Sequence, residues 1–447
     1  MATGLVSMVD EPCTDLAELG SGLRILLTDT KRGAVGARLG MAFAAMGCEL
    51  GMVCPWERHP AHGLNAIRRR YEYRGADPLG SLQAAIRDFD PHLVVPTCDW
   101  GVQHLHRLHA AAEQGADCQV MECIERSLGA ASSFPIVSSR YHLLMLAAEE
   151  GVAIPETVEI RSEDDLPRAG HPVVLKASGT WGGAGVAVAR SAADAVQAYR
   201  KLMARNSVPW LIRELLLNRD RANTLDGWWN SYPATIAQQW IDGRPANCAV
   251  ACVDGKVVAG VAVEVLATNG DCGPASLVEV VPGKEMIQAA GRIARRLKLQ
   301  GFFGLDFMIE RATGAVHLIE MNARCTQASA LTLGTGHNLP AAMCASLTGR
   351  QEPESEPMTR LPRIAYFPKP AQMADPDPRA RERNYHYDMP ANEPAFMAQI
   401  LEPWPYRGWL GRWLDRARTL AGELMPAGAP FSIEMRPRQP EKGRWMA

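Results

Sequence analysis

The chain has 447 residues, which at about 150 residues per domain predicts about three domains with enough core to need no disulfide or metal staples. Lys and Arg number 47 against 49 Asp and Glu, and the resulting net charge of −2 argues against a dedicated binder of nucleic acid or acidic membranes. A hydrophobic content of 47% with 21% charged residues excludes a disordered or fibrous chain, so we expect a soluble α/β protein.

The N-terminal stretch, residues 1–22, is expected to be a polar leader. It carries acidic residues where a signal peptide needs basic ones, and no run of about 18 apolar residues follows, so we expect a cytoplasmic protein without an integral membrane segment. The 11 Cys are scattered and include no Cys-x-x-Cys pair, which argues against a disulfide framework or a zinc site. Cys248 and Cys252 are interpreted as small packing residues.

The first domain is predicted over residues 23–135. Residues 24–28 are typical of a buried strand, and the glycines and alanines that follow to residue 46 indicate a turn and a helix. A helical stretch at 82–89 precedes an apolar strand at 93–96. This alternation predicts a Rossmann-like open sheet, although the glycine spacing is not that of a dinucleotide-binding loop.

A second domain is predicted over residues 136–350. It begins with a capped helix from Ser138 to Gly151, after which strands and hairpins alternate with helices in an α+β pattern. The pairs Asp254-Gly255 and Thr313-Gly314 mark two of the hairpin turns. Residues 351–447 are predicted to be a linker and a C-terminal extension rich in Pro and Trp.

A lysine followed by a glycine-rich loop is the first chemical motif. Lys176 ends an apolar strand, and the loop carries Gly179, Gly182, Gly183 and Gly185. Such a loop lets backbone N–H groups approach phosphate oxygens while the lysine neutralises their charge. It is not a Walker A loop, because no Gly-Lys-Ser/Thr follows, and taken alone it is equally compatible with a structural turn.

Polar residues in a second strand pair form the other motif. Alternation along the strand sends Glu320 and Asn322 to one face, and a tight hairpin can bring Asp306 beside them. Three hard oxygen donors suit Mg²⁺. Burying two acidic groups in apolar strands is costly without a cation, which favours a metal site. The alternative is an incidental polar pair.

Taken together, Val-Leu-Lys176-Ala-Ser-Gly, Gly-Leu-Asp306-Phe and Glu320-Met-Asn322-Ala-Arg324 resemble the ATP-grasp superfamily over roughly residues 23–350. The resemblance is to its carboxylate–amine ligase branch, which is related to carbamoyl phosphate synthetase and biotin carboxylase. It implies that the Rossmann-like domain precedes a two-lobed ATP-grasp domain.

The resemblance implies a role for each motif residue. Lys176 would contact ATP phosphates, and Gly179 to Gly185 would form a mobile loop over them. Arg324 would steady the reacting acyl group. The expected ligands of Mg²⁺, or alternatively of Mn²⁺, are Asp306, Glu320 and Asn322.

Two further positions match the family less closely. Arg140 stands where the family has its first ATP-contacting lysine, and it keeps the charge with a different donor geometry. Gln239, Trp240 and Ile241 resemble the hinge that contacts adenine, with Gln239 in place of the usual Glu. Backbone groups of Trp240 and Ile241 can still serve there, and the alternative is a core strand that bears one Trp.

The function that follows is an ATP- and Mg²⁺-dependent ligase that activates a carboxylate as an acyl phosphate for attack by an amine. A bicarbonate-activating enzyme of the carboxylase or carbamoyl type is the alternative, although the sequence contains no biotin-carrier or glutaminase region. A nucleotide-binding module without turnover is a third, which the full set of Lys176, metal residues and Arg324 disfavours. The expected partners are a small carboxylate and an amine, which the sequence does not identify.

One stretch of the C-terminal extension has a separate interpretation. Residues 406–418 carry apolar residues at helical spacing with arginines between them. The pattern is compatible with an interfacial helix on a membrane surface, and packing on the parent domain is favoured over it.

Overall fold

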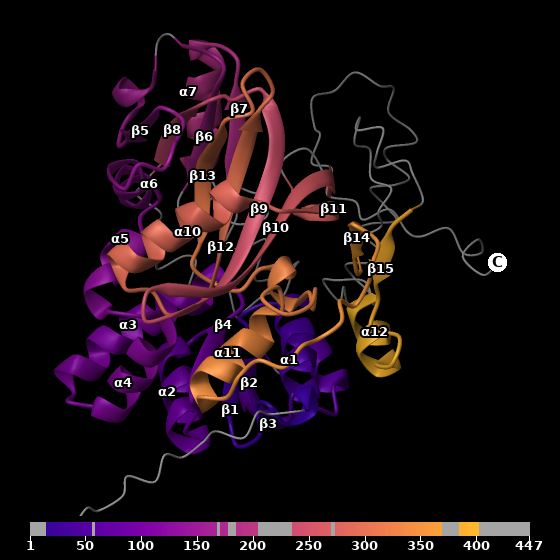
Figure 1. The fold of residues 1–447 in the computed structure, drawn as a ribbon. Helices are drawn as coiled ribbons and strands as arrows, with labels where there is room; N and C mark the ends of the chain where they lie inside the picture. The colour runs from indigo at the N-terminus through magenta and orange to yellow at the C-terminus, as the bar shows by residue number, and fades with distance from the viewer. Residues whose placement is uncertain are drawn as a thin grey trace, which may run out of the picture.

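A computed structural model describes residues 15–55, 59–167, 170–177, 185–203, 235–269, 273–368 and 384–401 of the chain. Gly179, Gly182 and Gly183 of the glycine loop and the 406–418 stretch lie outside the described residues. Figure 1 shows a helix-covered sheet unit at the N-terminus, in indigo and violet, below a larger antiparallel sheet in pink and orange.

The N-terminal unit is built on a parallel sheet with strand order β3-β2-β1-β4. Its strands are β1 (Arg24–Thr28), β2 (Glu49–Cys54), β3 (Ile67–Glu72) and β4 (Leu93–Pro96). Its helices are α1 (Val35–Ala45), α2 (Pro78–Phe89), α3 (Asp99–Gln114) and α4 (Cys118–Leu128). The predicted strands at 24–28 and 93–96 and the helix at 82–89 are therefore confirmed.

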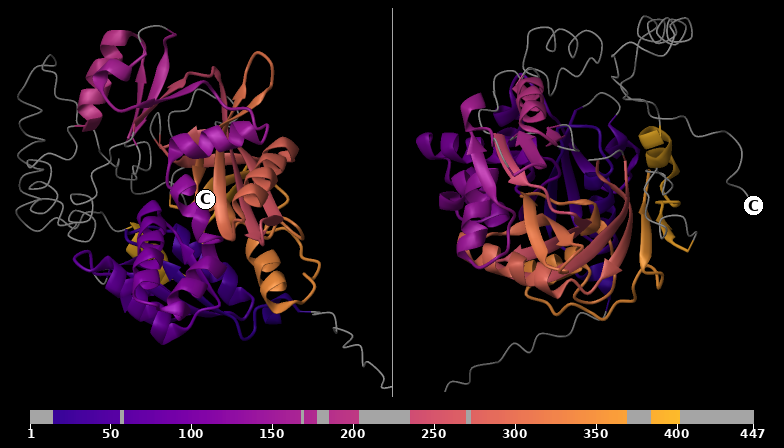
Figure 2. Two further views of the ribbon diagram at one scale, coloured as in Figure 1. Left: turned by 90° about the vertical axis from the view of Figure 1, so that its left-hand side faces the viewer. Right: turned by 90° about the horizontal axis from the view of Figure 1, so that it is seen from above.

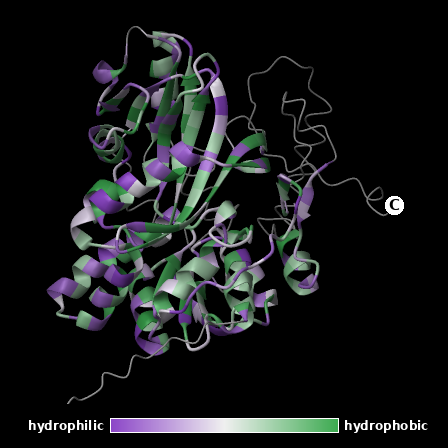
Figure 3. Cartoon of the chain, viewed as in Figure 1, coloured by the Kyte–Doolittle hydropathy of each residue, from purple (hydrophilic) through white to green (hydrophobic). Residues whose placement is uncertain are grey.

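Apolar residues on both faces of this sheet explain why helices cover both sides. Ile25 and Leu27 of β1 face a core that they share with α1, whereas Leu26 faces the core of α2, α3 and α4. The alternation of side chains along a strand makes such a division obligatory. Figure 3 shows hydrophilic residues on the outer surfaces of these helices.

A small antiparallel sheet with strand order β5-β8-β6-β7 follows. Its elements are α6 (Arg140–Glu149), β5 (Thr157–Ile160), β6 (Val173–Ala177), β7 (Val186–Ala189), α7 (Ala192–Met203) and β8 (Thr235–Gln239). The short helix α5 (Phe134–Val137) leads into it. Ser139 caps α6 with its side chain, close to the predicted start, and the helix ends before Gly151 as expected.

The large sheet has strand order β13-β12-β9-β10-β11-β14-β15. Its elements are β9 (Gly243–Val253), β10 (Lys256–Thr268), β11 (Ala275–Val281), α10 (Lys284–Leu297), β12 (Gly301–Glu310), β13 (Val316–Asn322), β14 (Arg363–Tyr366) and β15 (His386–Asp388). The predicted turn at Asp254 and Gly255 is confirmed, since both residues have the positive φ that a tight hairpin turn requires. Cys248 and Cys252 are buried in this sheet, as interpreted.

Helix α11 (Leu339–Thr348) packs between the N-terminal unit and the large sheet and contributes to one core with both. Phe43 of α1 meets Phe302 of β12 edge to face, with ring centroids 5.9 Å apart. Leu19, in the expected leader, is also fully buried in this core. The views in Figure 2 show the N-terminal unit and the sheet in contact from two further directions.

The chain beyond residue 350 returns to both parts of the molecule. Strands β14 and β15 extend the large sheet, and helix α12 (Pro394–Leu401) contacts the short helix Pro60–Gly63 of the N-terminal unit. Arg38 of α1 forms an ion pair with Asp388 of β15. The mixed α/β fold, with a parallel sheet unit followed by antiparallel sheets, is the predicted one. None of the helices described is both long and apolar enough to cross a membrane.

Candidate active site

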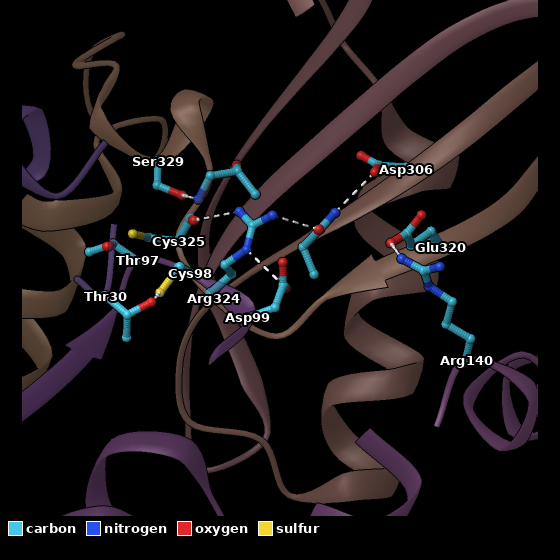
Figure 4. A network of polar contacts seen from close by, with 12 residues as sticks. Thr30, Thr97, Cys98, Asp99, Arg140, Asp306, Glu320, Arg324, Cys325 and Ser329 are labelled. Carbon is cyan, nitrogen blue, oxygen red and sulfur yellow. Dashed lines mark hydrogen bonds and ion pairs between the residues drawn. The ribbon is translucent and has the colours of Figure 1, made fainter. Parts of the chain in front are cut away.

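The predicted metal residues meet where β12 pairs with β13. Asp306 lies opposite Glu320 in the strand register, and Gly304 lies opposite Asn322, so the hairpin brings the three side chains together as expected. Both oxygens of Asp306 accept amide hydrogen bonds, Oδ1 from Asn247 Nδ2 at 2.6 Å and Oδ2 from Asn322 Nδ2 at 3.0 Å. Figure 4 shows Asp306 and Glu320 at one end of a polar network.

The electrostatics of the two acids favour a cation. Burial, followed by the neighbouring charge of Glu320, raises the pKa of Asp306 to about 6, against the opposing effect of the two amides. Within the described part of the chain, no group of three or more His, Cys, Asp and Glu side chains is placed to hold a metal. The two carboxylates nevertheless suit Mg²⁺, which uses one or two carboxylates together with water and substrate phosphates. Asn322 turns its amide nitrogen to Asp306 and its amide oxygen to Arg324.

Two cations of the predicted site lie beside Glu320. Arg140 Nη2 is 2.6 Å from Glu320 Oε1, and Arg140 Nη1 donates to the carbonyl of Ala177 at 2.7 Å. Lys176 is only 4% exposed, and its Nζ lies 2.9 Å from the carbonyl oxygen of Ile319. These contacts join α6, β6 and β13 at one point. Arg140 stands in the first turn of α6, where the Ser139 cap fixes the start of the helix.

Arg324 connects this point to the N-terminal unit. Its Nε lies 3.0 Å from Asp99 Oδ1 in the first turn of α3, and its Nη2 donates to Asn322 Oδ1 at 3.0 Å. Burial alone would raise the pKa of Asp99, but the charge and hydrogen bond of Arg324 outweigh it and hold that pKa below its usual value. Likewise, burial would lower the pKa of Arg324, and the charge of Asp99 raises it further than burial lowers it. The guanidinium is therefore firmly held and fully charged.

The predicted hinge residues lie apart from this cluster. Gln239 ends β8, and residues 240–242 connect it to β9, so the segment joins the small sheet to the large one. Gln239 lies opposite Val173, whereas Ile236 lies opposite Lys176. Three residues along a strand correspond to about 10 Å. Trp240 is 42% exposed, so it is not part of a packed core strand.

Gly185 is the one loop glycine that the structure describes. Its carbonyl accepts a hydrogen bond from the backbone N–H of Ala177 at 2.9 Å, at the start of the β6–β7 pairing. The glycine loop therefore begins and ends beside Lys176.

Two residues of the cluster were missed by sequence reasoning, Asp99 and Asn247. Asp99 follows the buried strand β4 by three residues, and a polar residue at the carboxyl end of a parallel strand is a usable signal. Asn247 stands among small apolar residues in β9, directly opposite Asp306. An isolated amide in an apolar strand gives only a weak signal by itself.

Comparisons with known proteins bear on the family and the fold of the chain. Residues 146–345 match the family model described as the carbamoyl-phosphate synthase L chain, ATP binding domain. None of the curated proteins matches the chain in sequence.

Several solved structures share the fold. An ADP complex of N5-carboxyaminoimidazole ribonucleotide synthetase is 16% identical with a TM-score of 0.53, over 76% of this chain and 80% of that one. The biotin carboxylase domain of a Hydrogenobacter thermophilus 2-oxoglutarate carboxylase, with MgADP and bicarbonate, is 13% identical with a TM-score of 0.53, over 74% and 71%. An L-amino acid ligase from Bacillus licheniformis is 13% identical with a TM-score of 0.50, over 75% of each chain.

Proposed function

Because this chain belongs to the ATP-grasp superfamily of ATP-dependent ligases and carboxylases, we propose that it is a carboxylate–amine ligase that works through an acyl phosphate. A carboxylate oxygen attacks the γ-phosphorus of ATP, and the bond to ADP breaks. The amine nitrogen then attacks the acyl carbon, phosphate leaves, and the nitrogen loses a proton. The carboxylate needs this activation because its oxygen is a poor leaving group.

The arrangement of Arg324 carries the proposal. Its guanidinium contacts both Asp99 and Asn322. Asn322 in turn donates to Asp306, so the Asn322 side chain links Arg324 to the acidic pair. A fixed, planar cation beside the proposed metal ligands can bind the substrate carboxylate while that carboxylate receives the phosphoryl group. The same cation can then stabilise the oxyanion that forms when the amine attacks. A module that only binds nucleotide has no use for this cation.

The remaining residues are proposed to bind ATP. Lys176 would contact the phosphates, together with the glycine loop that begins and ends beside it, and Arg140 would add positive charge. The segment Gln239–Ile241 would contact adenine, and its separation of about 10 Å from Lys176 along the small sheet is suited to an extended nucleotide.

Asp306, Glu320 and Asn322 would hold Mg²⁺. When bound, the ion neutralises charge on the transferred phosphoryl group and on the leaving ADP. Asn322 Oδ1 accepts from Arg324, and a carbonyl oxygen has a second lone pair for a further contact. The Asn322 amide also contacts both Arg324 and Asp306, and so connects the arginine to the pair of Asp306 and Glu320.

The test is ADP release from MgATP in the presence of panels of carboxylates and amines. We expect turnover that requires both an organic acid and an amine, with ADP and phosphate as products. AMP and pyrophosphate as the main products would contradict the acyl-phosphate route. ADP release that depends on bicarbonate alone would favour the carboxylase or carbamoyl-type alternative, and ADP binding without turnover under any combination would favour the binding module.

A further inference from the structure

Two cysteines from distant parts of the chain meet in the core that joins the N-terminal unit to helix α11. Cys48 directly precedes β2, and Cys344 stands in α11, 296 positions further along the chain. Their sulfur atoms lie 3.5 Å apart, and both are free thiols. Figure 1 shows α11 beside the N-terminal sheet. The two thiols therefore face each other across the boundary between two parts of the fold.

Each cysteine is held by the backbone on its own side of this boundary. The N–H of Cys48 donates to the carbonyl of Phe43, in the last turn of α1, at 3.2 Å. Helix α11 is capped by Asn338, whose side chain accepts from the N–H of Ala341 at 3.2 Å. Both cysteines belong to the same buried cluster as Phe43. Packing and these hydrogen bonds thus keep the two sulfurs close together without a covalent bond.

A buried glycine leaves room for the two sulfur atoms. Gly20 follows the short helix Leu16–Glu18, and its N–H donates to the carbonyl of Met46 at 2.7 Å. A β-carbon at position 20 would overlap Cys48 Sγ and would lie 3.2 Å from Cys344 Sγ. A larger residue therefore fits at this position only if the Cys48 sulfur turns away from its present place.

The two thiols differ in their access to solvent. Cys48 is 8% exposed, whereas Cys344 is fully buried. The hydrogen bond with Cys48, followed by burial, raises the pKa of Cys344, so Cys344 keeps its proton and donates it towards Cys48 Sγ. The thiolate is the form of cysteine that reacts with oxidants, and it forms more readily at the sulfur that reaches solvent. We therefore expect Cys48 to react first and Cys344 second.

We propose that Cys48 and Cys344 are the site of a reversible disulfide bond, which forms when a hydroperoxide oxidises the folded protein. The Cys48 thiolate attacks one oxygen of hydrogen peroxide, the O–O bond breaks, and a sulfenic acid and hydroxide form. The hydroxide takes up the proton that Cys48 lost. The Cys344 sulfur then attacks the sulfenic sulfur, the S–O bond breaks, and the Cys344 proton leaves with the hydroxyl group as water. Two thiols and one peroxide thus give one disulfide and two waters, and a thiol reductant reverses the bond.

The bond joins the N-terminal unit covalently to the helix that packs between it and the large sheet. The two sulfurs must approach by about 1.5 Å, which small rotations of the two side chains supply. A cross-link between positions so far apart in the sequence closes a long loop and so restricts the unfolded chain more than the folded one. We therefore expect the oxidised protein to resist heat better than the reduced one, whether or not the chain is a ligase.

Peptide mass spectrometry tests the pairing. The reduced, folded full-length protein is treated with hydrogen peroxide, free thiols are blocked in denaturant, and the protein is digested with trypsin without reductant. We expect peptides 39–58 and 325–350 to become linked, and fragment spectra must assign the bond to Cys48 and Cys344 because each peptide carries a second cysteine. Oxidation of Cys48 to a sulfinic acid without linkage, a bond between other cysteines, or unreacted thiols would overturn the inference. Equal linkage in protein unfolded with urea would show that the fold does not direct the bond.

Variants connect the bond to stability. Oxidation should raise the melting temperature by about 3–5 °C, and dithiothreitol should abolish the rise. Cys48→Ala and Cys344→Ala should lose both the bond and the rise, whereas Cys123→Ala, at a buried cysteine of α4, should behave like the unaltered protein. Gly20→Ala keeps both thiols and should slow linkage by about tenfold or more, because the Cys48 sulfur is displaced. Linkage at the unaltered rate in Gly20→Ala, or an oxidised protein that melts no higher than the reduced one, would contradict the inference.

Discussion

Arg324 and Asp99 are 225 positions apart in the chain, and their side chains meet at 3.0 Å. The contact joins the segment after β13 to the first turn of α3, and so couples the N-terminal unit to the acidic pair of the large sheet. It also fixes the orientation of a guanidinium that has a second bond to Asn322. The proposed chemistry depends on that orientation.

Replacing Asp99 by Asn should lower kcat/KM by about 10²-fold, because the guanidinium loses its charged anchor and small displacements of a catalytic group are costly. The free energy of unfolding should fall by about 1–3 kcal/mol, since a hydrogen bond to a charged group is weakened in a partly buried position. Steady-state kinetics and urea unfolding measure both effects. Asp164→Asn, at an exposed position, is the control, and equal kinetics in the two variants would remove Asp99 from the site.

Replacing Glu320 by Gln should raise the Mg²⁺ concentration that gives half-maximal turnover by at least about tenfold, because a metal ligand loses its charge. The melting temperature of the protein without Mg²⁺ should change little, because the weaker hydrogen bond from Arg140 is offset by the loss of charge repulsion between residue 320 and Asp306. Glu285→Gln, in the exposed first turn of α10, is the matched control. An unchanged Mg²⁺ titration in Glu320→Gln would show that this residue does not bind the ion.

Lys176→Ala and Arg324→Ala should separate kinetically. The lysine is proposed to hold phosphates in the ground state, so its loss should weaken ATP binding in calorimetry. For Arg324→Ala we expect near-normal ATP affinity with kcat lowered by about 10²- to 10³-fold, the effect of removing one preorganised oxyanion donor. Arg324→Lys should also be impaired, because an ammonium lacks the planar fork. Loss of ATP affinity with kcat preserved in Arg324→Ala would instead make the arginine a nucleotide ligand.

Local sequence pattern was sufficient to predict the β12–β13 hairpin and its polar face. Alternation along β13 places Glu320 and Asn322 together, and the turn at Thr313-Gly314 brings Asp306 into register with Glu320. The same reasoning gave strands β1 and β4 and helices α1 and α2 of the N-terminal unit, since each is defined by residues that are close in sequence.

Contacts between distant segments were beyond that reasoning. Asn247 reaches Asp306 because β9 pairs with β12 across 59 residues, and strand neighbours are set by packing of whole faces rather than by local periodicity. The pair of Asp99 and Arg324 depends in turn on how the N-terminal unit docks on the large sheet. For the same reason, β14 was not foreseen as a strand of that sheet, although Ile364 and Ala365 are fully buried there.

The acyl phosphate is the central claim, and the fate of a carboxylate oxygen tests it most directly. The acid identified in the panel is prepared with ¹⁸O in its carboxylate and turned over with unlabelled MgATP and the amine, and mass spectrometry follows the phosphate released. Because the attacking oxygen stays with phosphorus when the amine displaces phosphate, the account predicts one ¹⁸O atom in each phosphate, with ADP as the nucleotide product. Phosphate that carries no ¹⁸O while the amide accumulates would contradict it.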